Sequence, residues 1–199
     1  MKKIIITGPT GAIGHALIEK CLAEQCEVYA VCRPGSERIK SLLKYKKLHI
    51  IECDLSEITK AESLLPIDCD IFYHFGWAGT FGDNRNNMSL QIKNLEYTID
   101  AVHLAYKCGC NTFIGAGSQA EYGRVDGKLR DDTPAFPENG YGMAKLCAGQ
   151  MSRIEAHKLG LRHIWARILS VYGPYDGKYT MIMSTIEKLL KGEIPEFTK

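Results

Sequence analysis

The chain has 199 residues, of which 45% are hydrophobic and 24% are charged, so it can bury the core of one domain with the beginning of a second attached. This composition excludes a disordered protein. Lysine and arginine total 25 against 23 aspartate and glutamate, without a long run of one sign, so we expect no nucleic-acid or membrane partner, whereas a small anionic ligand stays open.

Short apolar runs alternate with amphipathic stretches along the chain. Enrichment in Ile, Val, Phe and Tyr predicts strands at 3–7, 27–32, 48–53, 71–75, 112–116 and 163–168. Helical patterns occupy 12–24, 36–45, 57–64, 86–108, 141–159 and 181–191. This order predicts an α/β fold with a mainly parallel, doubly wound sheet covered on both faces, which is the Rossmann architecture.

The amino-terminal apolar run is too short for the core of a signal peptide or for a membrane span, and we interpret it as a buried strand. The eight cysteines include no pair with CxxC spacing. We therefore expect free, mostly buried thiols in a reducing compartment, no metal site, and a cytoplasmic location.

A glycine-rich loop follows the first strand and opens the first helix, with the sequence TGPTGAIG at residues 7–14. Such a pattern also occurs in glycine-rich turns of other α/β proteins, but this position favours a dinucleotide site. The first glycine permits a tight turn, the second lets the pyrophosphate approach the backbone, and the third lets the helix pack on the strand. The predicted contacts are Gly8, Thr10, Gly11, Ala12, Ile13 and Gly14, with the helix N-terminus facing the phosphates.

The end of the second strand predicts the choice of dinucleotide. Cys32 stands near the position where an NAD-binding chain normally carries a carboxylate, and Arg33 and Ser36 follow it. These residues fit a 2′-phosphate, so we expect NADP(H) to be preferred, with NAD(H) as the alternative because an arginine after a strand is often only solvated. Asp54 and Leu55, after the third strand, are candidates for the adenine pocket.

Tyr141 and Lys145 stand four residues apart, which places a phenol and an ammonium on one helix face. A tyrosine that titrates near pH ~10 becomes a useful base at neutral pH only when a cation such as Lys145 favours the phenolate. Ser118 follows the fifth strand and can hydrogen-bond a substrate oxygen. Tyrosine and lysine at this spacing occur in many helices. Their order after the glycine loop and the serine nevertheless predicts an enzyme that couples proton transfer to hydride transfer. Lys145 is also expected to reach the nicotinamide ribose.

The chain resembles the extended short-chain dehydrogenase/reductase family, the NAD-dependent epimerase/dehydratase group that acts largely on nucleotide sugars. The resemblance covers essentially the whole chain. Its motifs are TGPTGAIG at 7–14, CDL at 53–55, YHFGWAG at 73–79, Asn94 in the fourth helix, GSQAEYG at 117–123, YGMAK at 141–145 and RILSVYGP at 167–174.

The resemblance implies a set of site residues and a partner. It assigns Gly8, Gly11 and Gly14 to pyrophosphate and Asp54 and Leu55 to adenine. It implies further cofactor contacts from Phe75, Gly76, Trp77, Asn94, Tyr141 and Lys145, and catalysis by Ser118, Tyr141 and Lys145. It also implies a nucleotide-sugar substrate and a homodimer formed as a four-helix bundle by the helices at 86–108 and 141–159.

Two departures from the family pattern limit what the resemblance implies. In the sugar 4,6-dehydratases an Asp-Glu pair follows the catalytic hydroxyl, whereas here Ser118 is followed by Gln119 and Ala120, so water elimination is not expected. Typical members also continue further and build a substrate lobe. We therefore expect an NAD(P)-binding domain at 1–173 and the start of a short or truncated substrate-binding lobe at 174–199.

Three functions stay open at this point. The first is a nucleotide-sugar epimerase, the second is a 4-keto-sugar reductase that uses NADPH, and the third is a non-catalytic dinucleotide-binding protein. His74 either contacts the ligand or is a packed, hydrogen-bonded core residue, and the second interpretation is favoured.

Overall fold

The computed structural model describes residues 1–177 and 180–197. Its strands are β1 (Lys3–Thr7), β2 (Glu27–Cys32), β3 (Leu48–Glu52), β4 (Ile71–His74), β5 (Thr112–Ser118) and β6 (Arg162–Ile168). Its α-helices are α1 (Ala12–Ala23), α2 (Met88–Lys107), α3 (Gly140–Lys158) and α4 (Met181–Leu190). Four 3₁₀ helices lie among them, namely η1 (Glu37–Leu42), η2 (Leu55–Leu64), η3 (Gly82–Asn86) and η4 (Gln119–Glu121).

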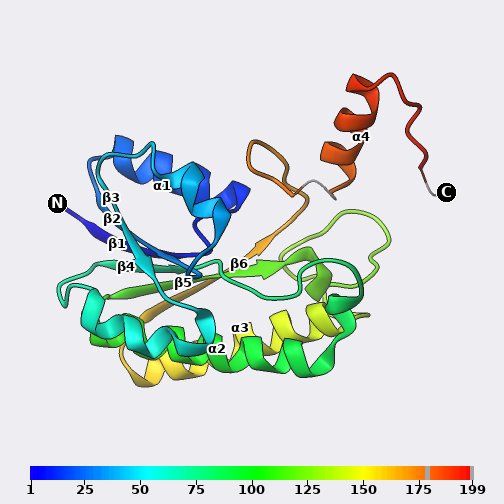
Figure 1. Cartoon of the computed structure of the whole chain (residues 1–199). Coiled ribbons are helices and arrows are strands. Elements are labelled where there is room, and N and C mark those ends of the chain that lie inside the picture. Colours follow the sequence, from blue (N-terminus) through cyan, green and yellow to red (C-terminus); the bar gives the residue numbers. More distant parts are fainter. Residues whose placement is uncertain (178–179, 198–199) are drawn as a thin grey trace.

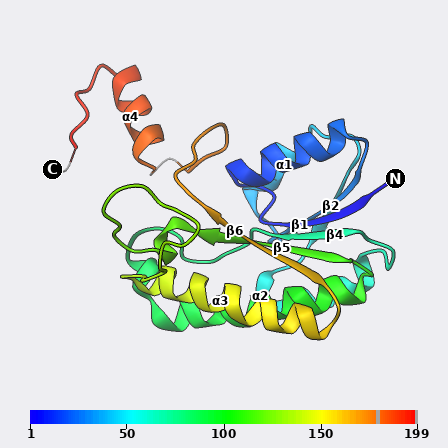
Figure 2. The same ribbon diagram turned by 180° about the vertical axis from the view of Figure 1, so that it is seen from behind.

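The six strands form one parallel sheet in the order β3-β2-β1-β4-β5-β6. Helix α1 covers one face of the sheet, and α2 and α3 pack side by side on the other (Figure 1; Figure 2). The strand order reverses direction between β1 and β4, and sheets of this type bind ligands at that reversal, at the carboxyl ends of the strands. The predicted doubly wound Rossmann fold is confirmed.

Alternation along β1 divides the core into two halves. Ile5 joins the cluster under α2, with Phe72 and Phe113, whereas Ile4 and Ile6 join the cluster under α1. Successive side chains of a strand point to opposite faces, so the uninterrupted apolar run at residues 4–6 of this central strand contributes to both layers. Burying each such side chain contributes about 1.5–3 kcal/mol.

Two of the predicted helices are 3₁₀ helices, and a third begins later than predicted. The segments at 36–45 and 57–64 form η1 and η2, and Glu57 interrupts η2 with non-helical backbone angles. Short segments of this kind adopt the tighter 3₁₀ form readily. Helix α2 begins at Met88 because Asn87 caps it, its side chain accepting from Leu90 N–H at 3.1 Å.

Helix α4 differs from the other three α-helices because none of its residues is buried. It stands apart from the two helical layers, beyond the loop that follows β6 (Figure 1). Residues 178–179 and 198–199, which belong to the segment predicted to begin the substrate lobe, lie outside the described residues. Across the described ranges, no helix is both long and apolar enough to cross a membrane.

Candidate active site

Two glycines of the glycine loop, Gly8 and Gly14, lie where the backbone leaves no room for a side chain. Gly8 has φ +67°, and a Cβ there would lie 2.7 Å from the Gly76 nitrogen. A Cβ on Gly14 would lie 2.5 Å from the Gly8 carbonyl oxygen, so helix α1 packs directly on the loop. A Cβ on Gly11 would meet no atom nearer than 3.8 Å, which leaves open space beside this residue. Gly8 and Gly14 are therefore required by the packing of the loop, whereas the predicted approach of a pyrophosphate at Gly11 stays a prediction.

The start of α1 fits an anionic ligand. The helix begins after Gly11 with no side-chain cap and no acidic residue in its first turn, which contains Ala12 and Ile13. The first N–H groups of a helix lack partners within it and carry a partial positive charge. Arg38 of η1 fixes the main chain of the loop, because its Nη2 donates to the Thr10 carbonyl oxygen at 2.5 Å. These features fit the pyrophosphate of a dinucleotide.

Arg33 follows β2 and Asp54 follows β3, so both lie at the ends of these paired strands. Hydrogen bonds from the N–H and hydroxyl of Ser56 lower the pKa of Asp54, and the charge of Arg33 lowers it further. Arg33 is exposed, Cys32 is buried, and the Ser36 N–H donates to the Arg33 carbonyl at 3.3 Å. The residues predicted at the adenine-ribose end therefore lie on adjacent strand ends.

The end of β4 closes on the glycine loop. The Gly76 N–H donates to Thr7 Oγ1 at 3.1 Å, and a Cβ on Gly76 would lie 3.0 Å from the methyl groups of Leu55. The ring of Phe75 packs edge-on against Tyr73, with centroids 5.7 Å apart, as part of the core under α1. Phe75 thus borders the loop through its main chain, while its side chain stabilises the core.

Asn94 and His74 use their polar atoms inside the protein. Asn94 Oδ1 accepts from the Ala78 N–H at 2.8 Å, and its Nδ2 donates to the Ala78 and Leu90 carbonyls. These contacts hold the loop after β4 against α2, and the cofactor contact expected of Asn94 stays a prediction. His74 pairs with Thr7 at 3.0 Å and Thr98 at 3.4 Å, and burial lowers its pKa to about 3, in agreement with the favoured core interpretation.

Tyr141 lies in the first turn of α3, with Lys145 one turn later. Asn139 caps this helix by accepting from the Gly142 N–H at 2.9 Å. Lys145 Nζ donates to the Ala116 carbonyl at 2.7 Å and lies 3.7 Å from the Trp77 ring centroid. Burial lowers the pKa of Lys145 to about 7. Its Nζ is 5.8 Å from the Tyr141 ring centroid.

Ser118 ends β5 and lies beside Tyr141. Its Oγ accepts from the Ala120 N–H at 3.2 Å. Burial raises the pKa of Tyr141, while hydrogen bonding with Ser118 and the charge of Arg85 act to lower it. The structure thus brings the serine, tyrosine and lysine predicted from the sequence to the same end of the sheet.

Glu121 was not predicted as a site residue, although it lies inside the quoted motif at 117–123. Its fully buried carboxylate accepts from the Ser118 N–H at 2.8 Å, Trp165 Nε1 at 3.0 Å and Arg167 Nε at 2.7 Å. It therefore ties the end of β5 to β6. We refer to Ser118, Glu121, Tyr141 and Lys145 together as the Tyr141 corner.

Arg85 was also missed, because no motif spacing marks it. It lies in η3, between β4 and α2, and its guanidinium carbon is 4.5 Å from the Tyr141 ring centroid. Trp77 approaches the same ring edge-on, with centroids 6.1 Å apart. The Trp77 ring and the Arg85 guanidinium therefore flank the tyrosine on the side of the β4 loop.

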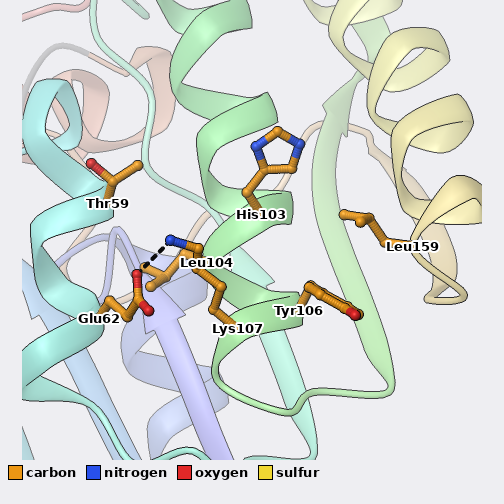
Figure 3. A pocket seen from close by; sticks show the side chains of 7 residues that line it. All are labelled: Thr59, Glu62, His103, Leu104, Tyr106, Lys107 and Leu159. Atoms are coloured by element: carbon orange, nitrogen blue, oxygen red, sulfur yellow. Dashed lines mark hydrogen bonds and ion pairs between the residues drawn. The ribbon is translucent and has the colours of Figure 1, made fainter.

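A groove of about 260 Å³ lies elsewhere, between η2, α2 and the end of α3. Glu62 and Lys107 reach toward each other along it and pair at 2.6 Å (Figure 3). None of the residues predicted for catalysis or cofactor binding lines it. The lining residues are Thr59, Glu62, His103, Leu104, Tyr106, Lys107 and Leu159.

The glycine loop, the strand order and the Tyr141 corner define a Rossmann protein of the dehydrogenase type, and comparison with known proteins identifies the family. The chain belongs to the NAD-dependent epimerase/dehydratase family, whose model matches residues 4–199. An uncharacterized UDP-glucose epimerase of Bacillus subtilis (strain 168) is 25% identical over 186 residues, which cover 86% of this chain and 57% of that protein. A dTDP-6-deoxy-L-talose 4-dehydrogenase (NAD(+)) of Aggregatibacter actinomycetemcomitans is 27% identical, covering 96% of this chain and 67% of that protein.

Solved structures share the fold. UDP-glucuronic acid 4-epimerase from Bacillus cereus, in complex with NAD, matches with a TM-score of 0.82 and 22% identity, covering 96% of this chain and 63% of that one. UDP-glucose 4-epimerase from Thermotoga maritima matches with a TM-score of 0.85 and 20% identity, covering 96% and 64% of the two chains. The chain thus spans 57–67% of the length of these relatives.

Proposed function

We propose that the protein is an NAD(P)-dependent oxidoreductase or epimerase that acts by hydride transfer on a nucleotide sugar, or on a related keto or hydroxy substrate. The observation that carries the proposal is the meeting of Ser118, Tyr141 and Lys145 at the carboxyl ends of the strands, the edge that also holds the glycine loop. Family membership and the sugar nucleotides named for its relatives support the substrate class.

The residues of the chain have distinct tasks in this proposal. When bound, the nicotinamide supplies or accepts the hydride. Tyr141 accepts the proton of a substrate hydroxyl in the oxidising direction and donates it in the reducing direction. Ser118 orients the substrate oxygen through its hydroxyl, and Lys145 holds the nicotinamide ribose. The α1 N-terminus and Gly11 hold the pyrophosphate.

The end of β2 supports NADP(H) as the preferred dinucleotide. Arg33 is exposed there and is free to turn toward a 2′-phosphate, with Ser36 beside it, and position 32 carries a thiol in place of a carboxylate. NAD(H), named for several relatives, is the alternative. A reductase that releases NADP+ in each cycle fits NADP(H), whereas an epimerase that retains its dinucleotide fits NAD.

Titration with NADPH and with NADH, followed by nicotinamide fluorescence, tests the cofactor site. We expect selective NADPH binding that Arg33→Ala weakens at least tenfold, and unchanged binding in Arg153→Ala, which removes an exposed arginine of α3. Tight NADH binding without an Arg33 effect would favour an NAD-dependent epimerase. Absence of binding to either dinucleotide would contradict the proposal.

Turnover distinguishes an enzyme from a non-catalytic dinucleotide-binding protein. We expect hydride transfer with at least one member of a panel that contains UDP-glucose, UDP-glucuronic acid and a dTDP-4-keto-6-deoxy sugar. Tyr141→Phe removes the transferable proton and should lower the rate about 10²–10⁴-fold while dinucleotide binding persists. Saturable dinucleotide binding with no turnover in the unmodified protein would support the non-catalytic alternative.

A second copy of the chain is the proposed partner of α2 and α3, which together would form a four-helix bundle. Both helices expose large apolar side chains, namely Met88, Ile92, Met143, Met151 and Ile154. Exposed apolar patches of this kind mark interaction surfaces. Sedimentation should show a dimer that Ile92→Lys dissociates, and a monomer in the unmodified protein would contradict the proposed dimer.

The free, mostly buried cysteines support a reducing, cytoplasmic setting.

A further inference from the structure

A cation faces Tyr141 from a segment that belongs to none of the family motifs. The guanidinium carbon of Arg85 lies 4.5 Å from the Tyr141 ring centroid, within cation–π distance. Its Nη1 donates to the Thr80 carbonyl at 3.2 Å. This acceptor is neutral, so the hydrogen bond does not cancel the charge of the guanidinium. Among the ion pairs formed by residues 1–177 and 180–197, none includes Arg85.

The position of Arg85 is determined by the start of α3. Gly140 N–H donates to Asn86 Oδ1 at 3.0 Å, and a Cβ on Gly140 would lie 3.0 Å from the Arg85 carbonyl oxygen. On the other side, the Asn84 carbonyl accepts from Gln91 Nε2 at 2.8 Å. The backbone of η3 is therefore held against the residue that precedes Tyr141, so the guanidinium is held near the phenol.

Two cations lie beside Tyr141, and Arg85 is the nearer one. Lys145 follows on α3 with its Nζ bound to the Ala116 carbonyl, 5.8 Å from the Tyr141 ring centroid, whereas the Arg85 guanidinium carbon is 4.5 Å from it. Glu121 on η4 raises the pKa of Tyr141 through its negative charge, and Ser118 on β5 is neutral. An arginine stays protonated throughout the range in which proteins are folded.

We propose that Arg85 is a positioning residue that holds its guanidinium against Tyr141 and so stabilises the phenolate that receives the substrate proton. This inference rests on the proposed function, in which Tyr141 transfers the proton. A cation beside an acidic group favours the ionised form, and the effect is strong where water is largely excluded. Arg85 thereby adds a second cation to the one that Lys145 presents to Tyr141 from α3.

The ionisation of the phenol at position 141 tests this inference without turnover. A fluorinated tyrosine, whose phenol is more acidic than that of tyrosine, is placed at position 141 alone and titrated by phenolate absorbance in the unmodified background, in Arg85→Met and in Arg85→Lys. We expect Arg85→Met to raise the midpoint by about one pH unit, and Arg85→Lys to restore part of the difference. Arg153→Met, which removes an exposed arginine of the same helix as Tyr141, should leave the midpoint unchanged.

The pH profile of hydride transfer provides a second readout. The acidic limb of the rate in the oxidising direction should move upward by about one pH unit in Arg85→Met, and partly return in Arg85→Lys. An unchanged midpoint of the phenol in a folded Arg85→Met variant overturns the inference, whatever the activity. A shifted midpoint supports it, and absence of turnover from the same unmodified protein then counts against the proposed function alone.

Discussion

The glycine loop and the Tyr141 corner occupy the same edge of the sheet but are built in opposite ways. The loop depends on missing side chains, because Gly8 and Gly14 bring backbone into contact with backbone. The corner depends on buried polar side chains, because Glu121 and Lys145 hold charge away from water. Steric constraint therefore determines the structure of the glycine loop, and electrostatics determines that of the Tyr141 corner.

This difference determines how each region should respond to substitution. A loop that depends on excluded volume tolerates no added atom where the backbone is crowded. A buried polar cluster tolerates changes of shape better than changes of charge, since an unpaired buried group costs the full penalty of desolvation. Substitutions that add one methyl group or remove one charge distinguish the two kinds of construction.

The largest effect should come from Gly14→Ala. Its Cβ would lie 2.5 Å from the Gly8 carbonyl oxygen, and because backbone atoms cannot move aside, the free energy of unfolding should fall by more than about 3 kcal/mol. Dinucleotide binding should be lost with it. Gly11→Ala is the matched control, because its Cβ meets nothing nearer than 3.8 Å, so it should fold normally and bind the dinucleotide more weakly. Chemical denaturation measures the stability of both variants. Equal free energies of unfolding for Gly14→Ala and Gly11→Ala would contradict the steric explanation.

Glu121→Gln should have the next largest effect. The substitution keeps the shape of the side chain but leaves Arg167 without its carboxylate partner, which accepts at 2.7 Å. Because Arg167 is partly exposed and regains some water, we expect a loss of about 2 kcal/mol in denaturant unfolding, below the cost of a fully buried unpaired charge. A variant as stable as the unmodified protein would show that this buried pair contributes no net stability.

Lys145 should make stability depend on pH. Burial lowers its pKa from 10.5 to about 7, so between these values the unfolded chain binds a proton that the folded protein does not. Stability therefore rises as the pH increases above about 7, by at most about 1.4 kcal/mol per pH unit from this group, and the penalty is fully present at lower pH. Lys145→Met should flatten the curve of unfolding free energy between pH 7 and 9, whereas Lys93→Met, at an exposed position of α2, should leave its slope unchanged. Parallel curves for Lys145→Met and the unmodified protein would contradict the burial argument.

The smallest effect should come from α4. Leu190 is 83% exposed, and no residue of its helix is buried, so Leu190→Ala should change the free energy of unfolding by less than about 0.5 kcal/mol. Leu104→Ala, at a fully packed position of α2, is the contrasting substitution and should cost about 2–5 kcal/mol. A large effect at Leu190 would show that α4 packs against the sheet layers in solution.

Local sequence patterns were enough to predict most of the fold. Each strand was placed within two residues of its observed bounds, because uninterrupted apolar runs such as Ile4 to Ile6 are typical of buried parallel strands. The errors concern η1, η2 and the start of α2, where a few residues choose between α-helical and 3₁₀ geometry by cap and contact. The close packing at Gly8 and Gly14 was equally predictable, since it involves residues adjacent in the chain.

The sequence by itself therefore determined the order of elements, the family, the glycine loop and the Tyr141–Lys145 pair, because each is expressed in spacing along a single segment. Only the tertiary structure decided which charges meet. Glu121 pairs with Arg167 across 46 positions, and Arg85 reaches Tyr141 from a different connection of the sheet. Asn94 likewise accepts from the Ala78 N–H across 16 positions. Such contacts depend on how distant segments pack, and no local periodicity records them.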